Sequence, residues 1–241
     1  MLVFKASRDT YTLPLVSPLY SPPPWYSLGT MVQMVHYQAR REVIESLLPE
    51  PLEYCSDSVI AWISRGPFST HGPLNEAAIY LSCLFEGVRG VYEPFVYCDQ
   101  EVALVSGREV IGWAKKPGQI SLEARNETMR GELRRGGTRL MSLTCTTDRE
   151  ASLDEVPFGP EFIVKIIPSA EADVPAEVAQ IIRWEGMMTP RPGEFFSGRG
   201  SVHFDRDDID PLYILEPERV IAGYYGVIDM VLPNGKVVYS Y

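Results

Sequence analysis

Short apolar runs separated by Gly, Pro or Asp dominate the chain, and most are too short for helices. The run "TMVQMVHYQ", residues 30–38, places Met31, Gln33, Val35 and Tyr37 on one face of a strand and Thr30, Val32, Met34 and His36 on the other. Both faces are mostly apolar, which predicts a strand covered on both sides. Similar strand-like runs are "VIAWIS", "AIYLSCLFE", "EPFVYCD", "EVALVS", "TRLMSLTCTT", "FIVKIIP" and "AQIIRWEG". Many strands joined by short turns predict a mainly β fold, an antiparallel sheet curved into a cone or barrel with a few short helices.

Four other segments have patterns of their own. "ARREVIESLLPEPL" spaces Val43, Ile44, Leu47 and Leu48 as one face of a helix that Pro49 ends. The closing "YGVIDMVLPNGKVVYSY" has a Pro-Asn-Gly turn between two apolar runs and predicts a hairpin. "DEVPFGPE" and "MMTPRPGEFFSGRG" are expected to be loops. We expect a single domain over residues 1–241.

The N-terminal arm, about residues 1–28, includes the proline-rich "LPLVSPLYSPPPWYSLG". Its prolines exclude a helix and predict an extended segment that runs across the surface. A long ordered arm of this kind indicates contact with a neighbouring subunit, so a homo-oligomer is expected.

The amino-acid composition argues against some classes of binding partner. The 241 residues include 22 Lys+Arg and 32 Asp+Glu, a net charge of -10, which argues against nucleic acid and anionic membranes as partners. No run approaches the roughly 20 apolar residues that span a bilayer, and the first residues do not resemble a signal peptide. A cytoplasmic protein is therefore expected.

The cysteines Cys55, Cys83, Cys98 and Cys145 lie far apart in the chain without CxxC spacing, which favours buried reduced thiols. The chain has 3 histidines, and none lies at ligand spacing from a cysteine, so no metal site is expected.

The segment "SGREVIGWAKKPGQI", residues 106–120, sets Lys115 and Lys116 behind an apolar stretch. An ordinary lysine has a pKa of about 10.4, and both burial and a neighbouring cation lower it toward the range of a nucleophilic amine. Such an amine can attack a carbonyl group and form a Schiff base. Taken alone, the pair is weak evidence for catalysis, because adjacent lysines at the end of a helix are usually solvated.

The segment "GREVIGWAKKPG" resembles the lysine motif of the acetoacetate decarboxylase family. "SPLY", "LLPEPLEY", "EGVRGVYEPFVYCDQEVALVSGRE", "FIVKIIP" and "GVIDMVLPNGKVVYSY" follow in the family's order and approximate spacing. The resemblance spans nearly the whole chain. It implies the family's cone-like β fold, large homo-oligomers, a keto acid substrate and no cofactor, because the lysine itself serves as the electron sink.

The resemblance also implies roles for individual residues. Lys115 matches the lysine that forms the Schiff base, and Lys116 matches the second lysine, whose charge was held to depress the pKa of the first. Acetoacetate decarboxylase is itself a standard example of a lysine activated by its surroundings. Glu76 matches a glutamate that carries a proton or orients the imine, and Trp113 is expected to wall the pocket. With its pKa lowered, Lys115 would destabilise the fold at pH 7, so Lys115→Met is expected to raise the melting temperature.

Two polar residues of the family pattern are missing. "SLGTMVQMV" has no arginine to bind the substrate carboxylate, and "VIAWIS" has Ala61 and Trp62 in place of a second glutamate. Arg65, in the next loop, is a candidate replacement for the arginine.

Three functions therefore stay open. The first is a lyase that decarboxylates a β-keto acid such as acetoacetate through an imine on Lys115. The second is a pyruvate-dependent class I aldolase or aldolase-dehydratase that uses the same lysine. The third is a non-catalytic small-molecule binding barrel.

Overall fold

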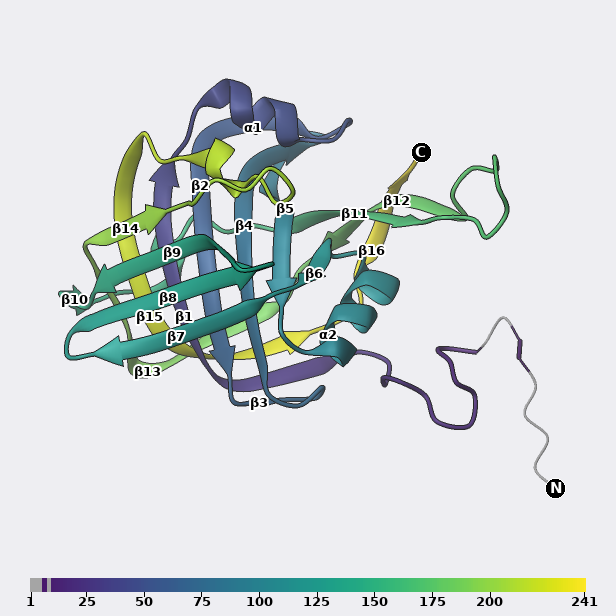
Figure 1. Cartoon of the computed structure of the whole chain (residues 1–241), viewed down its shortest axis with the longest axis horizontal. Coiled ribbons are helices and arrows are strands. Elements are labelled where there is room, and N and C mark those ends of the chain that lie inside the picture. The colour runs from purple at the N-terminus through teal and green to yellow at the C-terminus, as the bar shows by residue number, and fades with distance from the viewer. Residues whose placement is uncertain (1–5, 8–9) are drawn as a thin grey trace.

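Two β-sheets form the body of the protein in the computed structural model, which describes residues 6–7 and 10–241 (Figure 1). Within those residues the large sheet has 12 strands. They are β1 (Trp25–Gln38), β2 (Glu53–Gly66), β3 (Phe68–Ser69), β4 (Leu74–Phe85), β5 (Val88–Cys98), β6 (Lys115–Pro117), β10 (Arg149–Glu150), β11 (Glu161–Ile167), β12 (Val178–Trp184), β13 (Met187–Gly198), β15 (Arg219–Leu232) and β16 (Lys236–Ser240). The small sheet consists of β7 (Gln119–Arg125), β8 (Thr128–Arg135), β9 (Thr138–Thr146) and β14 (Gly200–His203).

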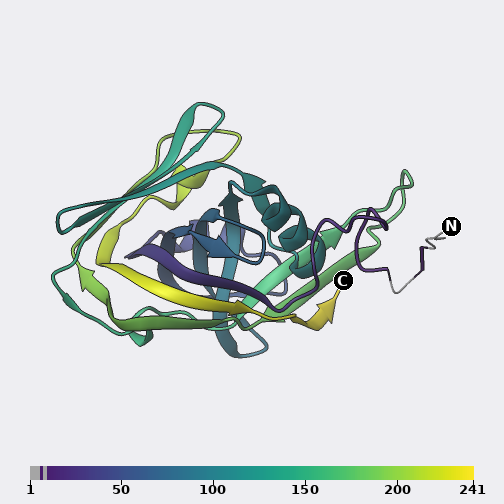
Figure 2. The ribbon, with the colours of Figure 1, turned by 90° about the horizontal axis from the view of Figure 1, so that it is seen from below.

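The large sheet is strongly curved. Its strand order is β10-β13-β15-β1-β2-β4-β5-β11-β12-β16, with β3 beside β1 and β6 beside β5. β12 and β13 lie near opposite ends of this order, yet only Glu185 and Gly186 join them. The two ends of the sheet must therefore curl toward each other, as the view in Figure 2 shows. The predicted mainly β, cone-like fold is confirmed; the sheet does not close into a barrel, because β10 and β16 do not pair.

The two faces of the large sheet support different cores, and β1 shows both. Val35 and Tyr37 belong to the core between the two sheets, while Val32 and Met34 pack on the other face with Trp62. This confirms the prediction of a strand covered on both sides. The small sheet covers the first face with buried apolar side chains, among them Ile120, Leu122, Leu133, Leu140, Met141 and Leu143.

The predicted helix is confirmed as α1 (Arg41–Leu47), which buries Ile44. The run "EVALVS" was predicted to be a strand and is instead α2 (Glu101–Ser106), whose first turn is capped by the Gln100 side chain at Ala103 N, 2.8 Å away. An apolar run of six residues is too short for its periodicity to distinguish a helix from a strand. The cap favours the helix. The remaining helical segments are the π-helix η1 (Gly107–Ile111) and the 3₁₀ helices η2 (Leu153–Glu155) and η3 (Leu212–Leu215).

Two predictions near the C-terminus were wrong. β15 and β16 do not form a hairpin: β15 is already paired with β1 and β13 on its two edges, so β16 crosses over and pairs with β12. The segment "MMTPRPGEFFSG" is not a loop but β13, which pairs with β15 and carries an irregularity between Pro190 and Phe195. Pro192 lies where the ladder is interrupted and Pro190 at the edge of the interruption, which is where a strand tolerates proline. "DEVPFGPE" is mostly loop, as predicted.

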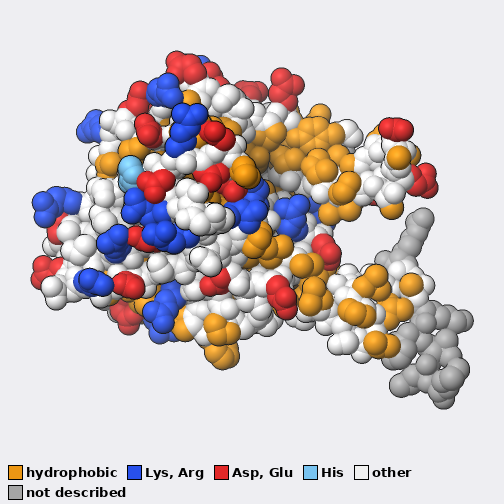
Figure 3. Space-filling model, in the orientation of Figure 1, with side chains coloured by type: hydrophobic (Ala, Val, Ile, Leu, Met, Phe, Trp, Pro, Cys, Tyr) orange, Lys and Arg blue, Asp and Glu red, His pale blue; other side chains and the backbone are white. Residues whose placement is uncertain are grey.

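The predicted arm contains no helix or strand over residues 6–7 and 10–24, but residues 25–28 already belong to β1. It does not run across the surface as predicted and instead extends away from the body (Figure 1). Residues 1–5 and 8–9 of the predicted arm lie outside the described residues. The arm is attached at Tyr20, whose hydroxyl donates a hydrogen bond to Glu109, and at Trp25, whose indole donates to the Ser21 carbonyl at 2.8 Å. Hydrophobic side chains gather on the arm and on the adjoining end of the large sheet (Figure 3), where Ile166, Val237 and Tyr241 are exposed. Contact with a neighbouring subunit stays a prediction.

No helix within the described residues has the length and apolar character needed to cross a membrane.

Candidate active site

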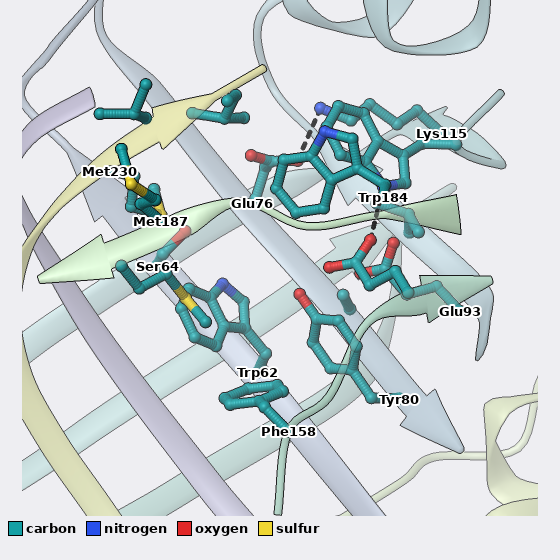
Figure 4. Close-up of a pocket in the computed structure, with 17 residues that line it drawn as sticks. Trp62, Ser64, Glu76, Tyr80, Glu93, Lys115, Phe158, Trp184, Met187 and Met230 are labelled. Atoms are coloured by element: carbon teal, nitrogen blue, oxygen red, sulfur yellow. Dashed lines mark hydrogen bonds and ion pairs between the residues drawn. The ribbon is translucent and has the colours of Figure 1, made fainter. Parts of the chain in front are cut away.

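A cavity of about 70 Å³ lies on the face of the large sheet that the small sheet does not cover (Figure 4). Since a buried water needs about 10–15 Å³ of such space, this is room for a small organic molecule. Its lining residues are Trp62, Ser64, Glu76, Ala78, Tyr80, Glu93, Val96, Trp113, Lys115, Phe158, Glu161, Trp184, Met187, Met188, Met230, Val231 and Leu232.

Strand alternation explains much of this lining. Trp62 and Ser64 on β2, and Glu76, Ala78 and Tyr80 on β4, are spaced by two residues and therefore point to one face. The intervening residues of both strands point into the core between the sheets.

Lys115 begins β6, which pairs in parallel with β5 so that Lys115 lies opposite Val96. The chain arrives there through η1 and Gly112, which has a φ of 103°. A Cβ at Gly112 would come within 2.5 Å of the Lys165 Cβ, and one at Gly107 within 2.9 Å of the Lys115 Cδ. The glycines of "GREVIG" thus let the chain turn tightly and lie against the lysine stem.

Lys115 and Glu76 are brought together as predicted from the sequence. Lys115 Nζ lies 2.7 Å from Glu76 Oε1, and the two side chains are 5% and 20% exposed. Lys115 Nζ also lies 5.0 Å from the centre of the Trp113 ring, which lines the cavity beside it. A buried amine, an acid in contact with it and an aromatic wall therefore share one site.

The expected lowering of the Lys115 pKa does not hold in this structure. Burial lowers the pKa of Lys115, but the charge of Glu76 and its hydrogen bond raise it more, so that the pKa lies above its ordinary value. A raised pKa contributes stability below the unfolded pKa and loses it as the pH rises through the folded pKa. Lys115→Met is therefore expected to lower the stability of the fold and not to raise it.

Lys116 is not brought to the cavity. As the next residue of β6 it points to the opposite side, where its Nζ lies 2.6 Å from Asp210 Oδ1. Asp210 also binds Arg135 at 2.9 Å and accepts a hydrogen bond from Tyr97 at 2.8 Å. With its charge paired there, Lys116 is poorly placed for the predicted tuning of Lys115.

Arg65 is also absent from the cavity. It follows Ser64 on β2, so its side chain leaves the opposite face of the strand, where it is exposed beside Met31 and Arg125. The structure thus argues against Arg65 as the replacement for the missing arginine. Trp62, at the position of the missing glutamate, does face the cavity.

Sequence reasoning missed two carboxyl groups that line the cavity, the buried Glu93 and the half-buried Glu161. Burial and the charge of Glu161 raise the pKa of Glu93 well above its ordinary value. Burial also raises the pKa of Glu161, to about 7, although the Trp113 indole, 2.9 Å from Glu161 Oε2, donates a hydrogen bond that favours the ionised form. One signal in the sequence was Pro94, since a proline inside a central strand indicates a bulge and bulges often adjoin active sites.

Aromatic and sulfur-containing side chains close the rest of the cavity. Trp62, Tyr80 and Phe158 contact one another edge to face, with ring centres 5.2 to 6.2 Å apart, and Trp184 meets Trp113 at 5.0 Å. Met187 and Met230 lie across from them (Figure 4). Such walls exclude water and strengthen the electrostatic interactions inside.

Other predicted groups lie elsewhere. Cys55 is half-buried and Cys83, Cys98 and Cys145 are buried, all of them free thiols as expected. In the part of the chain that the structure describes, no three His, Cys, Asp or Glu side chains are grouped as a metal ion would require.

Comparisons with known proteins point to one family. The family model "Acetoacetate decarboxylase (ADC)" matches residues 12–241. The acetoacetate decarboxylase of Chromobacterium violaceum is 29% identical over 97% of this chain and 96% of its own, and that of Acidiphilium cryptum is 27% identical over 97% of each.

Solved structures share the fold. One from structural studies of acetoacetate decarboxylase has a TM-score of 0.89 at 24% identity, covering 97% of this chain and 96% of that one. The enduracididine biosynthesis enzyme MppR complexed with pyruvate has a TM-score of 0.84 at 22% identity, covering 98% of this chain and 100% of that one. Because the family model matches almost the whole chain, the protein belongs to the acetoacetate decarboxylase family.

Proposed function

We propose that this enzyme is a lyase that decarboxylates a β-keto acid such as acetoacetate through an imine on Lys115. The observation that carries the proposal is the buried Lys115 Nζ, 2.7 Å from Glu76 at an apolar cavity. Relatives named acetoacetate decarboxylase, which are similar to this chain over 97% of its length, support the same reaction.

The first step needs a neutral amine. Because Glu76 holds Lys115 as an ion pair, the proton moves from Nζ to Glu76 across their hydrogen bond as a keto acid displaces water from the cavity. The free amine then adds to the ketone carbonyl. Loss of water, with the proton returned from Glu76, gives a protonated imine.

The imine cation then accepts the electron pair of the breaking carbon-carbon bond, and the carboxylate leaves as carbon dioxide. The neutral enamine that remains takes a proton on carbon, and water hydrolyses the resulting imine to release the ketone and Lys115. The apolar walls assist the cleavage, since charge is neutralised as carbon dioxide forms and a dry site favours that change.

The test is reductive trapping. The protein is incubated with acetoacetate, treated with borohydride and weighed intact, with Lys115→Ala as the control. An adduct on the native chain that is missing from the control, together with released carbon dioxide, is the expected result. If carbon dioxide is released without a Lys115-dependent adduct, the imine mechanism is wrong.

A second candidate is the pyruvate-dependent aldolase or aldolase-dehydratase. The observation in its favour is that Lys115 is the lone Lys or Arg among the described residues that line the cavity, so no arginine holds a leaving carboxylate. A pyruvate adduct on Lys115, consumed when an aldehyde is added and without carbon dioxide from acetoacetate, would favour this candidate. If neither keto acid is trapped, the non-catalytic binding protein becomes the better hypothesis.

A further inference from the structure

Glu93 and Glu161 have no role in the steps above, yet both line the cavity beside Lys115. Glu93 is 7% exposed, and its Oε2 is buried without a hydrogen-bond partner among the described residues. A buried carboxyl oxygen left unpaired is costly unless something else meets it. In a cavity of substrate size, the ligand is the natural partner.

A local irregularity aims Glu93 into the cavity. β4 and β5 are in register at Ile79 with Phe95 and at Leu81 with Tyr92, so Glu93 and Pro94 together oppose the single residue Tyr80. This is a β-bulge, which bends the strand and turns a side chain away from simple alternation. Figure 4 shows Glu93 and Tyr80 among the side chains that line the cavity, and the two come from the neighbouring strands β5 and β4.

Glu161 joins Glu93 from the neighbouring strand. It is the first residue of β11 and lies opposite Val91 of β5, two residues before Glu93. Trp113 connects Glu161 to the lysine, because its ring lies beside Lys115 Nζ at 5.0 Å and its N–H donates to Glu161 at 2.9 Å. Glu161 is thus separated from the amine by a single side chain.

Charge decides what this pair can bind. Lys115 and Glu76 compensate each other, so an added keto acid brings one uncompensated negative charge into the cavity. Two further ionised carboxylates would repel it strongly at low dielectric. A neutral carboxylic acid, by contrast, donates a hydrogen bond, and a buried acid can be kept neutral for that purpose.

We propose that Glu93 and Glu161 form a protonated carboxyl pair that receives the carboxylate of the keto acid bound at Lys115 and replaces the arginine that the family pattern would supply. The inference rests on the proposed function, since it concerns the substrate of the same lysine. The two groups are binding residues: they donate hydrogen bonds to the substrate and form no covalent bond with it.

The surroundings of the pair predict its pH dependence. The two carboxyl groups face each other. Around them lie Tyr80 and Glu76 of β4, Lys115 of β6 and the Trp113 N–H. Burial and the nearby carboxylates raise both pKa values, that of Glu161 to about 7. Keto acid binding should therefore weaken as the pH rises above 7 and Glu161 ionises.

The experiment compares two trapping reagents on the whole chain, acetoacetate and acetone, of which only the first has a carboxylate. Half-saturating concentrations for borohydride-trapped adducts are measured from pH 6 to pH 9 by intact mass, counting all adducts on the protein. Because both reagents need the Lys115 amine, the ratio of the two concentrations isolates the carboxylate. For the native chain, the preference for acetoacetate is expected to fall roughly tenfold or more over this range.

Three variants complete the test. Glu161→Gln stays neutral and keeps a donor, so its preference for acetoacetate should persist to pH 9. Glu161→Leu removes one of the two donors, so the preference should already be reduced at pH 6. Glu123→Leu, at an exposed glutamate outside the cavity, serves as the control that should follow the native profile.

Two results would overturn the inference. One is a preference for acetoacetate in the native chain that stays constant to pH 9; the other is a Glu161→Leu variant that still prefers acetoacetate as the native chain does. Failure of the proposed function looks different, because then neither acetoacetate nor acetone gives a Lys115-dependent adduct at any pH.

Discussion

The two faces of the large sheet differ although the same strands build both. On the side of the small sheet, Ala61 and Ile63 of β2 and Ala77 of β4 are fully buried in an apolar core. On the other side, the alternate residues of those strands leave a cavity bordered by ionisable groups. Tight packing supplies rigidity to the first face, and that rigidity allows the second face to hold a hollow with buried charges, which packing alone would eliminate.

Lys115 and Lys116 repeat this contrast within one short strand. The first is 5% exposed and pairs with Glu76 at the cavity, whereas the second is 43% exposed and pairs with Asp210, which is 3% exposed. Identical side chains thus meet different surroundings because consecutive residues of a strand point to opposite sides. We expect their substitutions to affect different measurements.

The largest expected effect is on catalysis at this lysine pair. Lys115→Ala should reduce carbon dioxide release by about 10⁴-fold or more, the order seen when a covalent nucleophile is removed. Lys116→Ala should keep the borohydride adduct and lose stability instead, because Asp210 loses one of its partners. Equal loss of activity in both variants, with both folded by circular dichroism, would mean that Lys116 takes part in the chemistry.

Adjacent alanines of β4 test the two faces with one substitution. Ala77→Leu inserts bulk into the core between the sheets and should cost about 1–3 kcal/mol of unfolding free energy. Ala78→Leu inserts the same bulk into the cavity and should suppress adduct formation with a smaller change in stability. Denaturant titration and trapping on both variants measure the contrast, and Ala78→Leu protein that is trapped as readily as the native chain would contradict the proposed site.

The ion pair between Lys115 and Glu76 at the cavity should stabilise the fold. Lys115→Met leaves Glu76 without its partner and is expected to lower the unfolding free energy at pH 7 by about 2 kcal/mol. Adding Glu76→Gln should restore part of that loss, since an amide does not need a cation. A double-mutant cycle by denaturant titration gives the coupling; additive losses would show that the two groups do not interact.

The ionic cluster on the opposite side should depend on pH. Burial raises the pKa of Asp210, but hydrogen bonds from Lys116 and Tyr97 and the nearby charges lower it more, to below its ordinary value. Its contribution is therefore present above the unfolded pKa of about 3.9 and is lost as the pH falls through the folded value. Asp210→Asn should cost about 2 kcal/mol at pH 7.

The measurement is thermal unfolding of Asp210→Asn and the native chain at several pH values. The difference between their melting temperatures should shrink as the pH is lowered toward 3.5. A difference that does not change with pH would assign the loss to packing and not to charge.

The smallest expected effect concerns Trp113. Its N–H favours the ionised form of Glu161 and so lowers the pKa of that group. Trp113→Phe removes the donor, and the pH at which the preference for acetoacetate over acetone declines should rise by up to about one unit. Tyr97→Phe, which loses a hydrogen bond on the other face, is the matched control and should leave that pH unchanged.

The sequence alone predicted much of the fold and part of the site. The period of two in β1 and the spacing of apolar residues in α1 are local patterns, and each gave the expected structure. The prolines of the arm excluded a helix, as expected, but did not determine its course away from the body. The resemblance pointed to Lys115 and Glu76, which the structure brings within 2.7 Å although 38 residues separate them in the chain. Their roles in catalysis stay predictions until the trapping experiment is done.

Other features depended on contacts that no local pattern contains. The closing turn predicts a hairpin, but β15 already has a neighbour on each edge and β16 pairs with β12. The apolar run of α2 forms a helix because the Gln100 side chain caps its first turn. Neither outcome follows from the alternation of apolar and polar residues within the segment.

The sequence by itself determined which residues share a face of each strand, because that follows from the two-residue period of the backbone. Only the tertiary structure decided which faces meet. It brought Glu93 and Glu161 from separate strands to the Lys115 cavity and turned Lys116 and Arg65 away from it. The physical reason is that a site depends on the pairing of distant strands and on the curl of the whole sheet, which are properties of long-range contacts.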